Sequence, residues 1–199
     1  SAGVPAETTA HTLVLDFNDE ASLSAAFASV GDEIAAVIVE PVVGNANLIA
    51  PKPGFLQLRR ELCRKHGAGL IFDEVMCGLR VAPGGAQARY GVDADLITLG
   101  KIIGGGLPLA AYGGRADLMR HIAPEGPVYQ AGTLSGNPLA VSAGLAVLGH
   151  LQANPQIYVD LEKRTGLLAA GLAAAGREHG IPLRVNQVGA MLSAHFSES

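Results

Sequence analysis

Short apolar runs alternate along the chain with longer stretches in which apolar residues recur at helical spacing. The first pattern is typical of strands and the second of amphipathic helices. Strands that alternate with helices favour a mostly parallel sheet with helices on both faces. The predicted fold class is therefore α/β, with three α/β/α layers. The expected strands are His11–Asp16, Ile34–Val39, Gly69–Phe72, Leu96–Leu99, Leu109–Tyr112 and Ala190–Phe196.

Capping signals mark the helix boundaries, because Asn, Pro and Gly favour particular positions at helix ends. The expected helices run from an Asn18 cap to Val30, from Pro53 to Gly67, from Asn137-Pro138 to about Leu151, and from Pro155 to about Ala175.

A weak boundary near residues 152–155 divides the chain into two predicted parts. Residues 1–152 contain the expected sheet and most of the helices. Residues 153–199 contain a linker helix and the start of a small α+β domain, which is too short to form a core of its own.

The composition is that of a core-forming protein, with 49% hydrophobic and 16% charged residues in 199 and a net charge of -4. This acidic balance argues against a nucleic-acid partner, and the apolar runs are too short for a membrane span. Neither an initiator Met nor a signal peptide is present, so we expect a piece of a longer protein or a processed product. Cys63 and Cys77 form no disulfide or metal-binding pattern, which favours a cytoplasmic compartment and no metal site.

Two charged residues lie at the ends of apolar runs. Asp73 follows the expected strand at 69–72, and Lys101 follows the one at 96–99, just before three glycines at 104–106. A lysine amine that condenses with the cofactor, and an aspartate facing its pyridine nitrogen, are what a protein contributes to pyridoxal phosphate chemistry. The alternatives are a lysine that reaches the surface and an aspartate that caps a turn or pairs with an arginine.

Other candidate positions have similar alternatives. Val75 could pack against a cofactor ring, although a lone valine is more often core. Asn45 could hydrogen-bond a cofactor or substrate group, or could simply belong to a turn with the glycine before it. The Thr133 hydroxyl and the backbone N–H groups near Gly132 could bind phosphate ahead of the helix that Asn137 is predicted to cap.

Together these residues resemble a known family, the class III (fold-type I) pyridoxal-phosphate aminotransferases. The match rests on Phe72-Asp73-Glu74-Val75, on Lys101, and on the run from Gly132 to Pro138. Further stretches resemble the glutamate-1-semialdehyde 2,1-aminomutase branch more than ordinary ω-transaminases. These stretches are Gly84–Gln87, Gly104–Pro108 with Ala111–Arg115, and Tyr129–Pro138.

The resemblance implies a role for each residue. Lys101 would carry pyridoxal 5'-phosphate and shuttle protons, Asp73 would partner the pyridine nitrogen, and Val75 would pack on the ring. Asn45 would lie near cofactor and substrate. Gly132 and Thr133 would contact the phosphate of a partner subunit's cofactor, which implies a homodimer with shared sites.

The same resemblance implies the activity. The enzyme would start from pyridoxamine phosphate and convert glutamate 1-semialdehyde into 5-aminolevulinate, the tetrapyrrole precursor. Family members are about twice as long, so this chain would hold the C-terminal part of the large cofactor-binding domain and the start of the small one. The alternatives are a class III ω-aminotransferase and an inactive fragment that serves in folding or dimerisation. A nucleotide-binding domain is disfavoured, because the chain has no phosphate-loop glycine pattern.

Overall fold

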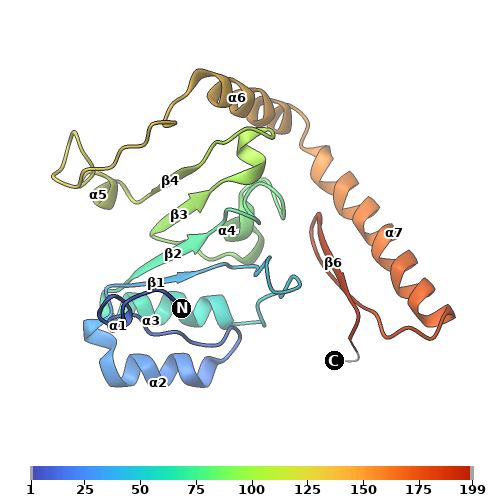
Figure 1. Cartoon of the computed structure of the whole chain (residues 1–199), viewed down its shortest axis with the longest axis horizontal. Helices are drawn as coiled ribbons and strands as arrows, with labels where there is room; N and C mark the ends of the chain where they lie inside the picture. Colours follow the sequence, from blue (N-terminus) through green and yellow to red (C-terminus); the bar gives the residue numbers. More distant parts are fainter. Residues whose placement is uncertain (1, 198–199) are drawn as a thin grey trace.

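A four-stranded sheet forms the centre of the computed structural model, which describes residues 2–197 (Figure 1). The strand order is β1-β2-β3-β4, in which the first three strands are parallel and β4 is antiparallel to β3. The expected α/β fold with a mostly parallel sheet is therefore confirmed. The strands are β1 (Ala36–Val39), β2 (Gly69–Asp73), β3 (Leu96–Leu99) and β4 (Ala111–Gly114).

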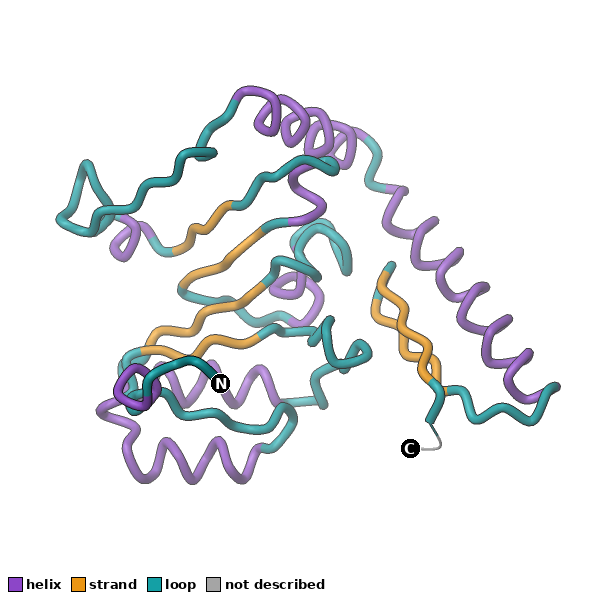
Figure 2. The backbone as a smooth tube through the Cα atoms, viewed as in Figure 1, coloured by secondary structure: helices purple, strands orange, loops and turns teal. Residues whose placement is uncertain are grey.

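Helices lie between and around these strands, and a hairpin near the end of the chain runs alongside the last helix (Figure 2). The α-helices are α1 (Ala6–Thr9), α2 (Glu20–Val30), α3 (Phe55–His66), α4 (Gly85–Tyr90), α5 (Ala116–Met119), α6 (Pro138–Ala153) and α7 (Gln156–Glu178). Two short 3-10 helices are η1 (Gly31–Glu33) and η2 (Lys101–Gly104), and the hairpin consists of β5 (Arg184–Val188) and β6 (Met191–His195).

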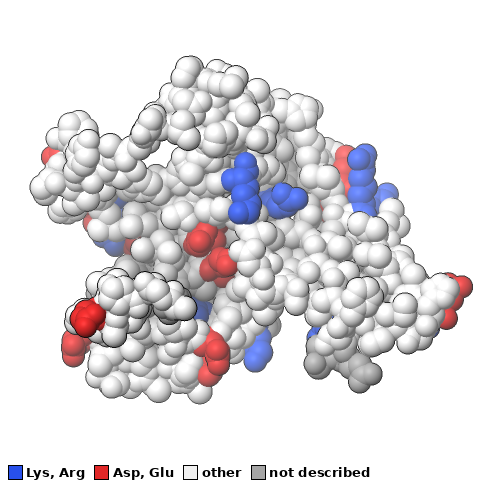
Figure 3. Space-filling view, in the orientation of Figure 1, with Lys and Arg blue, Asp and Glu red and all other residues white. Residues whose placement is uncertain are grey.

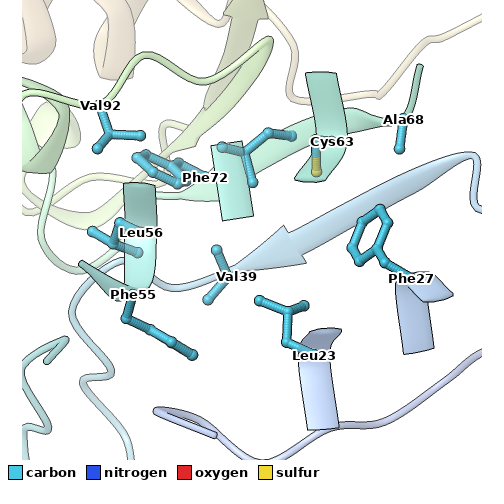
Figure 4. Packing of buried hydrophobic residues seen from close by; sticks show 10 residues of the cluster. Leu23, Phe27, Val39, Phe55, Leu56, Cys63, Ala68, Phe72 and Val92 are labelled. Carbon is cyan, nitrogen blue, oxygen red and sulfur yellow. The ribbon is translucent and has the colours of Figure 1, made fainter. Parts of the chain in front are cut away.

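The main core lies between one face of the sheet and helices α2 and α3 (Figure 4). Alternate residues of a strand point to opposite faces, so Leu70 and Phe72 of β2 both enter this core, where each is fully buried. Phe55 of α3 and Phe27 of α2 pack against them from the helical layer. The opposite face is more open at the edge strand, where Ile38 of β1 is 65% exposed.

A second apolar cluster joins the hairpin to the segments that follow β1 and β2. Val188 and Met191 of the hairpin pack with Val42, Leu48 and Val81. The sequence predicted the strand that the structure shows as β6 but missed its partner β5. The division into residues 1–152 and 153–199 stays a prediction.

Two expectations for the first part of the chain were wrong. The stretch His11–Asp16 forms no strand, because its exposed backbone has no neighbouring strand to pair with in the described residues. Asn18 does not cap α2 either. It adopts a left-handed conformation (φ 66) and accepts a hydrogen bond from the Lys52 N–H, while Asp19 caps the helix by accepting from Ala21 and Ser22.

Asp95, which precedes β3, connects three strands through a buried carboxylate. Its oxygens accept hydrogen bonds from the Leu70 N–H (2.7 Å), from Arg60 (2.8 Å) and from Arg115 (3.0 Å). Burial alone would raise the pKa of Asp95, but these hydrogen bonds outweigh it and hold the pKa below the usual 3.8. Asp95 therefore stabilises the sheet in its ionised form.

We expect Asp95→Ala to lower the free energy of unfolding by about 3–5 kcal/mol, because it leaves Arg60 as a buried charge without its partner. Urea unfolding at neutral pH measures this loss. The exposed Asp117, which also pairs with Arg115, provides the control, and Asp117→Ala should cost less than about 1 kcal/mol.

The pH dependence gives a second test of the same carboxylate. Because its folded pKa is lowered, its contribution is complete above the unfolded pKa of about 3.9 and is lost as the pH falls through the folded pKa. Asp95→Ala should therefore remove part of the acid sensitivity. Equal losses in the Asp95 and Asp117 variants would contradict the role assigned to Asp95.

Candidate functional site

Several of the candidate residues lie where the parallel strands end. Asp73 is the last residue of β2 and pairs in register with Thr98 of β3, and Lys101 follows β3. The segment from Glu40 to Asn45 follows β1, which is parallel to both. In Figure 3 acidic and basic side chains lie near one another in the middle of this face, over the strand ends. The carboxyl edge of a parallel sheet is a common position for ligand sites.

The Asp73 carboxylate is held on one side only. Its Oδ1 accepts hydrogen bonds from the Val75 N–H (3.0 Å) and from the Thr98 hydroxyl (3.2 Å). Among the described residues no arginine pairs with it, and no hydrogen bond reaches its Oδ2. The carboxylate is therefore oriented and still has an oxygen available for another donor.

Thr98 is a site residue that the sequence analysis missed. The signal was available, because Thr98 is the polar residue within the apolar run that precedes Lys101. The role of Thr98 becomes clear only from the register between β2 and β3, which places Thr98 opposite Asp73.

The Val75 side chain packs close to Gly100, the residue that precedes Lys101. A Cβ atom added to Gly100 would lie 3.1 Å from Val75 Cγ1, so the valine side chain occupies the space that a larger residue before Lys101 would need. Lys101 itself has a left-handed backbone (φ 48), which is costly for a residue with a side chain. Its side chain is exposed and forms no ion pair with the described residues.

Glu74 is the buried acid of the site and has a structural role. It is 2% exposed and accepts hydrogen bonds from the N–H groups of Ala86 (2.7 Å) and Gln87 (3.4 Å) at the start of α4. Burial raises its pKa above the usual 4.5. Position 85 is a glycine, and a larger residue would not fit there, because its Cβ atom would clash with the Glu74 carboxylate. Glu74 therefore fixes the segment after β2 and is not available to a ligand.

The turn after β1 carries Asn45. Glu40 accepts a hydrogen bond from the Gly44 N–H (2.9 Å), and backbone hydrogen bonds join Val43 with Ile49. These contacts fix the turn, which leaves Asn45 exposed at its tip. The structure thus places Asn45 after a strand parallel to β2, although no hydrogen bond of the described residues joins it to Asp73 or Lys101.

Gly132 and Thr133 are not brought to Asp73 by this chain. They lie in an exposed segment between α5 and α6, and no hydrogen bond of the described residues joins them to the strand-end residues (Figure 1). Asn137 caps α6 as expected, because its side chain accepts from the Ala140 N–H (2.9 Å).

Other kinds of site find little support in the described part of the chain. No group of three or more metal-binding side chains occurs there, and no described helix is long and apolar enough to cross a bilayer. Both cysteines are buried and free, and burial, followed by the nearby Glu74, raises the pKa of Cys77 to about 12. Thiols in such surroundings remain protonated and unreactive near neutral pH.

Comparison with known proteins gives a consistent family. Residues 3–199 match the family model described as Aminotransferase class-III. A β-phenylalanine aminotransferase from Variovorax paradoxus is 40% identical, with a TM-score of 0.85 over 92% of this chain and 43% of that one. An ω-transaminase from Sphaerobacter thermophilus is 36% identical, with a TM-score of 0.93 over 100% of this chain and 45% of that one.

A glutamate-1-semialdehyde aminomutase from Pseudomonas aeruginosa PAO1 is also similar. It is 31% identical, with a TM-score of 0.82 over 100% of this chain and 46% of that one. The chain therefore spans less than half the length of each of these solved structures.

The contact between Gly100 and Val75 can be tested by stability. Gly100→Ala should lower the free energy of unfolding by about 1–3 kcal/mol, because the added methyl group overpacks against Val75. Combining it with Val75→Ala should cost less than the sum of the two single changes. Urea unfolding of the four proteins in this double-mutant cycle gives the coupling.

Gly113→Ala is the matched control, because a Cβ atom there would have no neighbour within 4 Å. Additive effects of the Gly100 and Val75 changes would show that the two residues do not touch.

Proposed function

Because the chain belongs to the class-III aminotransferase family, we propose that Asp73, Val75 and Lys101 hold pyridoxal phosphate in an enzyme that transfers amino groups. Two solved neighbours are described as a transaminase with PLP bound and an aminomutase in complex with PMP. The expected cofactor is thereby confirmed for the family. Because the chain spans less than half the length of these neighbours, the activity of the whole protein is part of the proposal.

The residues fit this cofactor. The Oδ2 of Asp73 can accept a hydrogen bond from the N–H of a pyridinium ring, while the Val75 N–H and the Thr98 hydroxyl donate to its other oxygen. Val75 offers an apolar surface beside it, and the glycine at position 100 leaves room for that side chain. When bound, pyridoxal phosphate supplies an electron sink for negative charge at a substrate carbon.

Lys101 is the group of this chain that can move a proton at the substrate carbon. A primary amine on a long, exposed side chain can take a proton and return it to another position, as general acid–base catalysis requires. A carboxylate at position 73 next to the bound ring favours a protonated nitrogen. The observation that carries the proposal is that neighbouring parallel strands bring Asp73 and Lys101 to the same edge of the sheet.

Within the family we propose the intramolecular reaction, the conversion of glutamate 1-semialdehyde into 5-aminolevulinate for tetrapyrrole synthesis. Its support is the set of stretches around Gly84–Gln87, Gly104–Arg115 and Tyr129–Pro138, together with the similarity to the Pseudomonas aeruginosa aminomutase.

Intermolecular amino transfer is the second candidate, and a specific observation favours it. The neighbours described as a β-phenylalanine aminotransferase and an ω-transaminase are more similar in sequence, at 40% and 36% identity, than the aminomutase at 31%.

Two substrate tests on the complete protein separate these functions. An aminomutase that is loaded with pyridoxamine phosphate should convert glutamate 1-semialdehyde into 5-aminolevulinate without any added amino acceptor. A transaminase should instead transfer the amino group of β-phenylalanine to a 2-oxo acid such as 2-oxoglutarate. Chromatographic product analysis distinguishes them, and failure of both reactions in a protein that binds the cofactor would overturn the proposed activity.

Asp73→Asn in the complete protein should lower turnover by about 100- to 1,000-fold, the scale of losing one preorganised charged contact. The amide cannot hold the ring nitrogen protonated, although it fills the same space. Steady-state rates with saturating cofactor measure the change, and the exposed Asp16→Asn serves as control. Near-normal turnover of the Asp73 variant would reduce this aspartate to a turn-forming residue.

We further propose that the protein is a homodimer in which Gly132 and Thr133 serve the partner's cofactor. The segment that carries them exposes large apolar side chains, with Tyr129 83% and Leu134 62% exposed. Exposed apolar residues close together are typical of interaction surfaces. The backbone between Gly132 and the capped start of α6 provides N–H groups for an anion.

Mixing two inactive complete proteins, one with Lys101→Ala and one with Thr133→Ala, tests this proposal. In a shared-site dimer one site of the hybrid carries both changes and the other carries none, so activity should partly return. Hybrid formation is checked by native mass spectrometry. Absence of recovery in proven hybrids would mean that Thr133 serves its own subunit.

A further inference from the structure

A hollow of about 550 Å³ lies between the turn that follows Asn45 and the open end of the β5–β6 hairpin. Residues 46–50 form one side of it, and residues 184–188 with His195 form the other. Asp73, Val75 and Lys101 do not line it, so it is separate from the cofactor site proposed above. Its volume lies within the range of sites for small organic ligands.

The hairpin directs particular side chains toward this hollow. Arg184 and His195 are direct partners in the antiparallel register, so their side chains lie on the same face of the hairpin. Asn186 follows on that face, and its side-chain amide donates a hydrogen bond to the Asn47 carbonyl (3.0 Å). This bond holds the turn and the hairpin together on either side of the hollow.

The charges of the hollow favour an anion. Arg184 is the one charged side chain in its lining, which contains no Asp or Glu. No described residue forms an ion pair with Arg184. Nδ1 of His195 is shielded from solvent and has no hydrogen-bond partner among the described residues. A shielded polar atom without a partner is costly, and a ligand that supplies one removes that cost.

The residues that line the hollow favour an organic carboxylate over other anions. Ile49, which is 38% exposed, and Val185 give the hollow an apolar side that suits a carbon chain. A guanidinium matches the two oxygens of a carboxylate in a fork, whereas a doubly charged phosphate usually requires more than one cation. We propose that this hollow binds a small organic acid, with its carboxylate on Arg184 and a second polar group on His195 Nδ1.

Calorimetric titration of the full chain with glutarate tests the proposal. Wild-type protein should show saturable binding, and Arg184→Gln should weaken it at least tenfold. Arg177→Gln is the matched control, because Arg177 is exposed near the end of α7 and does not line the hollow. Circular dichroism verifies that both variants keep the fold. If Arg184→Gln does not fold, two other measurements test the same proposal. His195→Phe should weaken the binding of glutarate, and the Arg184 Nε–H resonance of the wild-type protein should shift when glutarate is added.

Several results would overturn the proposal. Absence of saturable binding, or an equal loss in the Arg177 variant, would show that the hollow is not a carboxylate site. Binding of inorganic phosphate as tightly as glutarate at equal ionic strength would refute the assigned ligand class. Because these readouts need neither cofactor nor amino transfer, they succeed or fail independently of the proposed function.

Discussion

Burial of β2 beneath α3 is the constraint on which the rest of the molecule depends. Leu70 and Phe72 are fully buried in the main core, and the alternation of a strand then sends Asp73 to the opposite face of the sheet. Shifting the register by one residue would place the aspartate in the core and a phenylalanine at the site. The cost of burying an unpaired carboxylate excludes that arrangement, so core packing also positions the candidate site.

Two buried acids fix the sheet at its opposite ends, and their surroundings give them different properties. Asp95, at the start of β3, faces two arginines as well as a backbone N–H, and its pKa is lowered. Glu74, just after β2, is bonded by backbone N–H groups and a thiol without a cationic partner, and burial raises its pKa. Both acids therefore have structural roles, whereas the Oδ2 of Asp73 accepts no hydrogen bond from the described residues.

The region that follows β1 contributes both to the candidate site and to the packing of the β5–β6 hairpin. Hydrogen bonds within it fix the position of Asn45, and Val42 and Leu48 pack against the hairpin that follows α7. The hairpin is therefore joined to the sheet by a shared apolar cluster and by the bond from Asn186 to Asn47. This arrangement forms the hollow in which Arg184 and His195 face the turn.

The local pattern of the sequence was enough to predict the elements whose signals are contained within a few residues. The apolar runs at 69–72 and 96–99 form strands, and Asn137 caps α6 as its position before a proline indicates. Asp73 and Lys101 could likewise be selected, because a charge directly after an apolar run is visible without a structure.

Properties that depend on distant partners were decided by the tertiary structure. The stretch His11–Asp16 has the composition of a strand but no neighbour to pair with, and β5 becomes a strand because β6 lies beside it. Thr98 gains its role only through the register that sets it opposite Asp73, and Gly100 through the side chain of Val75. The sequence by itself determined which residues can carry the chemistry. The pairing of strands and the packing of helices decided which of them meet, because hydrogen-bonded register and buried contacts join residues far apart in the chain.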